Sequence, residues 1–287
     1  LENYKEAIAC YDKAIEIDGK DSGVWYLKGS ASFDLENYEE SIACYDKATG
    51  NEFEDEFKWY NKGESYFYLK NYEKAISCYD KAIELEDKEI IYRIRKGISY
   101  SCLKNYKEAI ACYDKAIKID GNEGYAWRSK GRAHHNLKNY KQAIACYAKA
   151  IAIDAKDTVA WLGIGYTYDK LENYEKAIAC YDKITKIDPK DMDAWSSKGL
   201  AYLQLKNYEK AIECYDKATK LNSKIAWFNK GFAYQKLENY NKSIACYDKV
   251  TEIDPKNGNA WYRKGWSYEK LENYEKAIAC YDKITKI

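Results

Sequence analysis

Residues 258–287 read GNAWYRKGWSYEKLENYEKAIACYDKITKI, and variants of this phrase recur along the whole 287-residue chain. Cysteines mark the recurrence at positions 10, 44, 78, 112, 146, 180, 214, 246 and 280. Every interval is 34 residues except the one from 214 to 246, which is 32. A fixed period of this length predicts a repeat architecture, in which each unit buries its apolar surface against its neighbours.

Each period divides into two amphipathic helices. The first keeps four residues at separations of four, three and three positions, as in Trp195, Gly199, Tyr202 and Leu205. The second keeps five residues at separations of three, one, three and three, as in Tyr208, Ala211, Ile212, Tyr215 and Ala218. Both spacings place their residues on one helical face. The pattern therefore predicts an all-α chain of stacked helix pairs.

Polar residues stand where these helices should begin. Asn precedes each second helix, from Asn3 to Asn273, and is a good N-cap because its side chain accepts from an orphan backbone N–H. The same role is expected before the first helices for Asp21, Asp55, Asp157, Asp191, Ser223 and Asn257.

Glycine recurs inside the first helices, at positions 29, 63, 97, 131, 165, 199, 231 and 265. A helical Gly costs about 1 kcal/mol relative to Ala, so eight of them imply a compensating contact. We expect each to lie against the Ala or Ser of its partner helix, such as Ala211 or Ser243.

Composition excludes several function classes. The chain has 47 basic and 46 acidic residues, so it offers no overall field that would attract nucleic acid or an anionic membrane. No apolar run is long enough to span a bilayer, and the first residues have no signal-peptide core. Most of the Tyr and Trp residues fall at core positions, which favours packing over base stacking. Because the chain begins with Leu, we expect it to be a fragment of a longer protein.

No constellation of catalytic residues emerges, so we predict that the chain is not an enzyme and needs no cofactor. The ten cysteines form no CxxC pair, and the two histidines are adjacent, unlike zinc ligands. We expect no metal site, reduced thiols with the repeat-register cysteines buried between helices, and hence a cytoplasmic location. The Asp–Lys pairs in the YDKA phrase indicate solvated surface.

The pattern resembles the tetratricopeptide repeat over the whole chain. The W, G, Y, A and F positions of that signature match Trp261, Gly265, Tyr268, Ala277 and Tyr281, and its Pro position matches Pro189 and Pro255. The resemblance implies a right-handed α-solenoid, or superhelix, of helix-turn-helix repeats. One departure is Lys in place of the usual Leu before Gly, except at Ile164. Another is Glu or Lys at the position where Gly often ends the first helix. We therefore expect the following Asn either to take the left-handed conformation or to cap the second helix.

The Trp frame gives the domain organisation, a single solenoid over 1–287. A partial repeat holding only a second helix comes first, and the last repeat is truncated: 1–21, then 22–55, 56–89, 90–123, 124–157, 158–191, 192–223, 224–257 and 258–287. The linker from Leu221 to Ser223 is two residues short and should change the local stacking angle.

The first helices vary at positions two, five, six, nine, twelve and thirteen of the repeat, whereas the second helices are nearly copies. In tetratricopeptide proteins these positions line the concave groove that holds peptide or helical ligands. An apolar, solvent-facing groove is typical of a protein interaction site. The predicted groove residues are Tyr26, Phe33, Tyr60, Phe67, Ile94, Arg95, Ile98, Arg128, Arg132, His135, Tyr166, Leu200, Phe228, Phe232, Tyr262 and Trp266.

Four of the five arginines lie close together, at 93, 95, 128 and 132, beside both histidines. Arg128, Arg132 and His135 share one helical face, and Arg95 should flank them. Guanidinium groups bind carboxylates by paired hydrogen bonds, so we expect an acidic segment of the partner here; the alternative is pairing with local acids such as Glu123. Chaperone-tail receptors of this family use five residues, the carboxylate clamp. Only two of these five match in the first three repeats, and only two match in the last three.

The sequence therefore predicts a scaffold that binds a partner protein or peptide, with no nucleic acid or membrane. One alternative is structural self-assembly, in which the exposed first and last second helices stack end to end. Another is an accessory domain of a larger enzyme.

Overall fold

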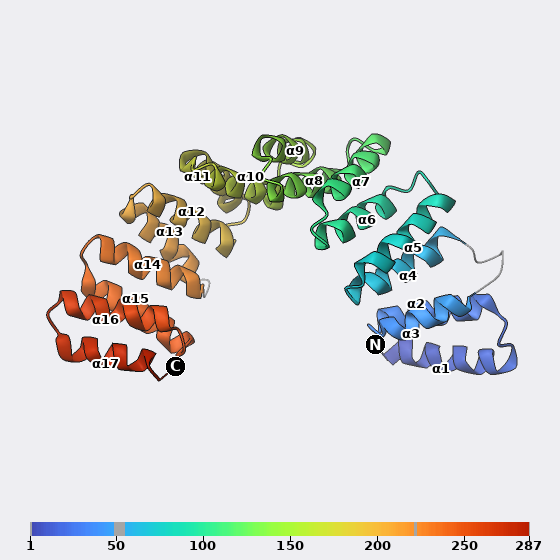
Figure 1. Ribbon diagram of the computed structural model, residues 1–287, viewed down its shortest axis with the longest axis horizontal. Coiled ribbons are helices and arrows are strands. Elements are labelled where there is room, and N and C mark those ends of the chain that lie inside the picture. The colour runs from blue at the N-terminus through green and yellow to red at the C-terminus, as the bar shows by residue number, and fades with distance from the viewer. Residues whose placement is uncertain (1, 49–54, 221–222, 287) are drawn as a thin grey trace. The chain divides into compact units, whose positions relative to one another are not determined.

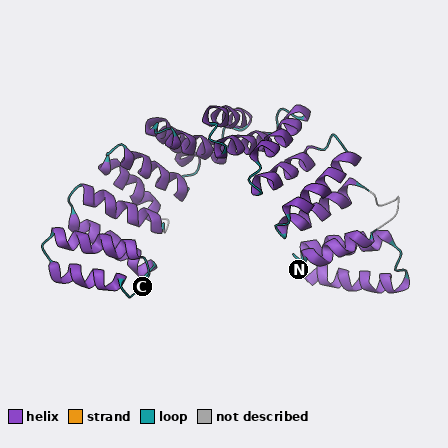
Figure 2. Ribbon diagram, viewed as in Figure 1, coloured by secondary structure: helices purple, strands orange, loops and turns teal. Residues whose placement is uncertain are grey.

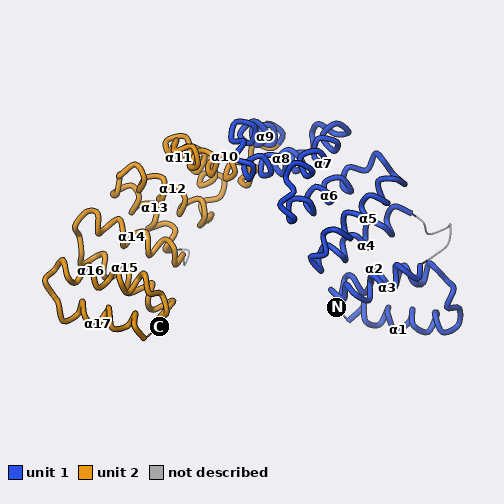
Figure 3. Tube along the Cα trace, in the orientation of Figure 1, with its two compact units in different colours: residues 1–153 blue, residues 154–287 orange. Residues whose placement is uncertain are grey.

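The computed structural model describes residues 2–48, 55–220 and 223–286, which contain seventeen α-helices and no strand (Figures 1 and 2). The chain divides into two compact units, unit 1 at residues 1–153 and unit 2 at residues 154–287 (Figure 3). The all-α, tandem-repeat architecture predicted from the 34-residue period is confirmed.

Helix pairs of nearly constant length build both units, and we call the first helix of each repeat the A helix and the second the B helix. The A helices of unit 1 are α2 (Ser22–Asp34), α4 (Glu56–Tyr68), α6 (Ile90–Cys102) and α8 (Gly124–Asn136). Its B helices are α1 (Glu2–Ile17), α3 (Tyr38–Lys47), α5 (Tyr72–Leu85), α7 (Tyr106–Ile119) and α9 (Tyr140–Ile153).

Unit 2 repeats the same alternation. Its A helices are α10 (Thr158–Lys170), α12 (Met192–Gln204), α14 (Lys224–Lys236) and α16 (Gly258–Lys270). Its B helices are α11 (Tyr174–Ile187), α13 (Tyr208–Lys220), α15 (Tyr240–Ile253) and α17 (Tyr274–Ile284). Within each unit consecutive helices pack together, and some A helices of successive repeats also touch, as α6 does α8 and α14 does α16. The variable A-helix positions of a unit therefore come together on one face.

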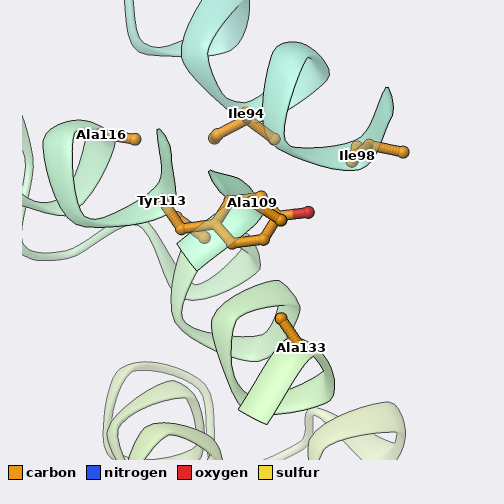
Figure 4. Close-up of a cluster of buried hydrophobic side chains, with 7 residues drawn as sticks. Ile94, Ile98, Ala109, Tyr113, Ala116 and Ala133 are labelled. Atoms are coloured by element: carbon orange, nitrogen blue, oxygen red, sulfur yellow. The ribbon is translucent and has the colours of Figure 1, made fainter. Parts of the chain in front are cut away.

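The B-helix tyrosine forms the core of each repeat. Tyr79, Tyr113 and Tyr215 are fully buried, and Figure 4 shows Tyr113 between Ile94 of α6 and Ala133 of α8. The ring also occupies the space beside the A-helix glycine: a Cβ added at Gly199 would lie 2.6 Å from Cε1 of Tyr215. The expected contact of glycine with Ala or Ser is wrong, because the flat face of the tyrosine ring fills that gap.

The lysine that precedes this glycine pairs with the aspartate of the preceding B helix. Lys130 Nζ lies 2.5 Å from Asp114, and the Lys130 side chain is only 17% exposed. Equivalent pairs join Lys28 to Asp12, Lys62 to Asp46, Lys96 to Asp80, Lys198 to Asp182, Lys230 to Asp216 and Lys264 to Asp248. The YDKA aspartates lie at the surface, as expected, since Asp114 is 51% exposed, and they also form ion pairs across repeat boundaries that the sequence did not predict.

The A helices end in a recurring Schellman turn. In the first repeat the backbone N–H of Glu36 donates to the carbonyl of Phe33, and that of Asn37 donates to Ser32. The residue with positive φ is the Glu or Lys itself, at Glu36, Lys70, Lys104, Lys138, Glu172, Lys206, Glu238 and Glu272. The expectation that Asn takes the left-handed conformation is wrong. Its capping role is confirmed at Asn71, Asn173, Asn207, Asn239 and Asn273, whereas the side chains of Asn37 and Asn105 make no cap hydrogen bond.

The A-helix caps are confirmed at all six expected residues, from Asp21 to Asn257, because each side chain accepts from a backbone N–H of the first turn. Leu221 and Asn222 lie outside the described residues, and with them most of the short linker. Eight cysteines are buried. Cys10 is exposed despite its register position, since α1 has no A helix before it, and Cys102 is also exposed.

Candidate protein-binding face

All sixteen predicted groove residues lie on A helices, but their exposure differs. Arg132, Tyr166, Leu200 and Tyr262 are exposed. Ile94 and Ile98 are only 3% and 9% exposed, because they pack with Ala126 and Ala133 of the next A helix. The others are half-buried: Tyr26, Phe33, Tyr60, Phe67, Arg95, Arg128, His135, Phe228, Phe232 and Trp266.

A hollow of about 410 Å³ opens between α6 and α8 in unit 1. We call it the isoleucine hollow, and its lining consists of Ile90, Ile91, Ile94 and Ile98 together with Glu89, Arg95, Glu123 and Tyr125. Most of the surface of Ile94 and Ile98 is therefore buried in the core, and the remainder lines the hollow. Aliphatic walls of this kind suit an apolar side chain from a partner.

The two carboxylates of the isoleucine hollow cap its helices. Glu89 precedes α6 and accepts from the backbone N–H of Ile91 at 3.2 Å. Glu123 precedes α8 and accepts from the N–H of Tyr125 at 2.9 Å. Both bonds are made by Oε1. The arrangement fixes two acidic groups at one end of the hollow.

The Arg95 guanidinium is held inside the protein. Its Nε and Nη2 atoms donate to the two carboxylate oxygens of Glu64 at 2.6 and 2.5 Å, and its Cζ atom lies 4.4 Å from the centroid of the Phe67 ring. Tyr79 donates to the same carboxylate at 2.6 Å. Burial, followed by the Glu64 charge and hydrogen bond, raises the pKa of Tyr79, so its hydroxyl stays a donor. Arg95 therefore flanks the other arginines in sequence but is paired with a local acid.

The remaining basic residues lie on α8. Arg128 places its guanidinium 4.9 Å from the ring of Tyr125, and the His135 ring lies 5.7 Å from that of Tyr140. Arg132 is exposed. The sequence placed these three residues on one face with Arg95, whereas the structure separates Arg95 from them by its bond to Glu64.

Aromatic side chains dominate the same face in the first repeats. Tyr38 and Tyr68 stack at 5.1 Å with their planes 8° apart, and Phe33 meets both edge-on. Phe67 contacts Tyr68 and Tyr72. Since Tyr68 is 51% exposed, this cluster presents ring surface to solvent.

Unit 2 carries a smaller hollow of about 210 Å³ between α14 and α16. It is lined by Lys224, Ile225, Phe228, Val250, Asn257 and Asn259. Phe228 packs on Tyr247 at 5.5 Å, and Tyr262 packs on Tyr281 at 6.0 Å. Position five of the repeat thus rests on the B-helix tyrosine while also bordering the A-helix face.

The sequence analysis identified the second position of the A helix as variable, but its predicted groove residues omit the exposed apolar side chains at that position. Phe57, Tyr125, Val159 and Ile225 stand there, with 55%, 40%, 55% and 67% of their surface exposed. These four residues occupy the same repeat position as Ile91, which the sequence had already identified as variable, so their role could have been predicted from the register.

Some buried polar groups beneath the A-helix face have hydrogen-bond partners, and others have none. Tyr181 donates to Asp169 at 2.5 Å, and burial, opposed by this bond, raises the pKa of Asp169. Among the buried side-chain atoms of the described residues, Asp169 Oδ1, Ser196 Oγ and the Tyr215 hydroxyl oxygen have no hydrogen-bond partner. Burial raises the pKa of Tyr215, and the nearby Asn229 amide acts in the opposite direction.

Helix pairs that repeat every 34 residues, with a variable A-helix face, define a helical repeat protein of the interaction-scaffold class. Models of the tetratricopeptide repeat match residues 1–21, 22–54, 58–88, 92–123, 124–157, 158–191, 193–224, 225–257 and 258–287. The chain therefore belongs to the tetratricopeptide repeat family, whose members are generally non-enzymatic scaffolds for protein–protein interaction. No curated protein matches it as a close relative.

Several solved structures share the fold. The C-terminal part of a tetratricopeptide repeat protein from Cytophaga hutchinsonii has 17% identity and a TM-score of 0.69, covering 82% of this chain and 97% of that one. YrrB, described as having an unusual peptide-binding site, has 23% identity and a TM-score of 0.54, covering 65% and 97%. MamA has 24% identity and a TM-score of 0.53, covering 56% and 94%.

None of the described helices is both long and apolar enough to cross a membrane. The described part of the chain also has no group of three or more His, Cys, Asp or Glu that could hold a metal ion.

Proposed function

We propose that the A-helix face holds a segment of a partner protein, with the isoleucine hollow taking an apolar side chain of that segment. The observation that carries this proposal is the hollow itself, an opening of about 410 Å³ with four isoleucines in its wall. The exposed ring of Tyr125 adds apolar surface to its lining. The peptide-binding description of YrrB is consistent with such a role. We place this activity in the cytoplasm, where the buried thiols would stay reduced.

A peptide display experiment tests the proposal. The full chain is used to select binders from a library of random 12-residue peptides, and the selected peptides are measured against Ile91→Asp. This change puts a charge into the hollow, while the aspartate is natural at the same register in Asp193. Affinity should fall at least tenfold, because an unpaired charge would meet the apolar side chain.

The control variant is Ala111→Glu on α7, an exposed B-helix position whose register equivalent is Glu213. It should leave affinity unchanged. Equal loss in both variants, or in neither, would place binding away from the hollow, and failure to select any peptide would oppose the proposal as a whole.

We further propose that Arg128 and Arg132 take an acidic group of the partner. Arg132 is exposed, and Arg128 lies over Tyr125 at the border of the isoleucine hollow. Arg128→Glu/Arg132→Glu should abolish capture of the selected peptides at unchanged helicity. Lys141→Glu/Lys149→Glu on α9 makes the same charge change at exposed B-helix positions and should have little effect. Unaltered affinity in the arginine variant would remove these residues from the site.

End-to-end self-association remains a second candidate, because the terminal helices of this chain expose apolar groups. None of the described α1 residues is buried, and Ile17 is 89% exposed. On α17, Tyr274 and Ile278 are 61% and 59% exposed. Light scattering across a concentration series should show mass growth that Ile278→Glu prevents; a constant monomer mass would dismiss this candidate.

A further inference from the structure

The isoleucine hollow is acidic at one end. Glu89 and Glu123 both line it, and each uses Oε1 for its helix cap. Arg95, the basic residue in the lining, is already neutralised by two hydrogen bonds to Glu64. Arg128 is not part of the lining, and its guanidinium lies over the ring of Tyr125 at the border. A ligand side chain entering the hollow therefore meets two carboxylates whose charge the Arg95 guanidinium does not offset. This charge favours a cationic neighbour for the apolar side chain.

Charge changes sign along α8. The helix starts after Glu123 and carries exposed Arg132 nine residues later. At a rise of about 1.5 Å per residue, the two positions are about 14 Å apart along the helix axis. An extended chain covers this distance in about four residues, at roughly 3.3 Å each.

We propose that the bound segment carries an aliphatic side chain next to a Lys or Arg, followed or preceded by an Asp or Glu about four residues away. The aliphatic group fills the isoleucine hollow, the cation lies beside Glu89 and Glu123, and the carboxylate reaches Arg132. This inference rests on the proposed function and specifies its partner. It also changes the chemistry expected from the arginine cluster alone, because a wholly acidic segment would be repelled at Glu89 and Glu123.

The peptides selected on the full chain test the charge pattern directly. Aligned on their aliphatic residue, they should be enriched in an adjacent Lys or Arg and in an acid about four positions away. Synthetic versions in which the two charged residues are exchanged should bind about tenfold more weakly. Main-chain direction is read from whether the cation lies before or after the acid.

A charge-removal variant gives the second measurement. Glu89→Gln/Glu123→Gln keeps an amide oxygen for each helix cap but removes both charges, so affinity should fall about three- to tenfold at low salt and less at high salt. Glu73→Gln/Glu108→Gln makes the same change in the exposed first turns of α5 and α7 and should change affinity less than twofold.

The outcomes separate the two proposals. Peptides that lose affinity with Ile91→Asp but carry acids beside the aliphatic residue, or bind Glu89→Gln/Glu123→Gln more tightly, overturn this inference and leave the proposed function intact. Peptides indifferent to Ile91→Asp, or no peptides at all, overturn both.

Discussion

Replacing Gly165 by Ala tests the packing that defines each repeat. A Cβ at this position would lie 2.5 Å from Cε1 and 2.8 Å from Cζ of Tyr181. The ring cannot move aside easily, since Tyr181 is fully buried and its hydroxyl is bonded to Asp169 at 2.5 Å. The neighbouring helices must instead separate by a substantial part of an ångström.

The expected free-energy change combines two opposing effects. Ala is favoured over Gly inside a helix by about 1 kcal/mol. Overpacking a filled core costs about 1–3 kcal/mol. The net result for Gly165→Ala should be a loss of about 0–2 kcal/mol in the free energy of unfolding. Gly258→Ala is the control, because its Cβ would meet only Ile284 at an ordinary 3.8 Å; it should be neutral or stabilising.

Hydrogen exchange read by mass spectrometry is the suitable assay, because repeat arrays do not always unfold in one step. Peptides from α10 and α11 should exchange faster in Gly165→Ala, whereas peptides from α16 and α17 should not do so in Gly258→Ala. If Gly165→Ala slows exchange in α10 by an amount equal to about 1 kcal/mol, the steric argument is refuted.

Four further substitutions differ in their expected effects on stability. Glu172 has φ of 57°, so Glu172→Gly should raise the free energy of unfolding by about 0.5–1 kcal/mol in denaturant titrations; a loss would show that the side chain matters more than the backbone. Tyr215→Phe should cost less than about 1 kcal/mol, because its hydroxyl has only the nearby Asn229 amide and no hydrogen bond of ordinary geometry. Tyr181→Phe should cost about 1–3 kcal/mol by depriving Asp169 of a donor; equal effects would contradict this. The raised pKa of Asp169 means that the folded state holds this proton more tightly than the unfolded chain, so stability falls as pH rises above about 3.9 towards the folded pKa. The stability of Asp169→Asn relative to the parent should therefore increase from pH 3 to pH 7, and a pH-independent difference would refute the assignment.

Local sequence signals predicted the fold well. The 34-residue period, the apolar stripes and the Asp or Asn caps each depend on residues within a few helical turns of one another. Contacts between helices were harder to predict. The space beside Gly199 could hold any partner-helix residue on the facing stripe, and only the relative register of α12 and α13 places Tyr215 there. The Lys–Asp pairs were missed for the same reason, because they join residues in neighbouring repeats, sixteen positions apart in all but the Lys230–Asp216 pair, which is fourteen apart.

The arginines show why the candidate site needed the structure. Arg95 and Arg263 both occupy position six of their repeats. The Arg95 guanidinium contacts Glu64 and Phe67, which are at positions nine and twelve of the preceding repeat. The Arg263 guanidinium contacts Phe232, which is at position nine of the preceding repeat. A side chain at position six is therefore directed towards the array itself, and its variation follows that of the neighbouring repeat. Arg132 is at position nine and exposed. Among these three arginines, it is the one whose position is best suited to a partner's carboxylate, and its replacement should reduce peptide affinity without the loss of stability expected for Arg95.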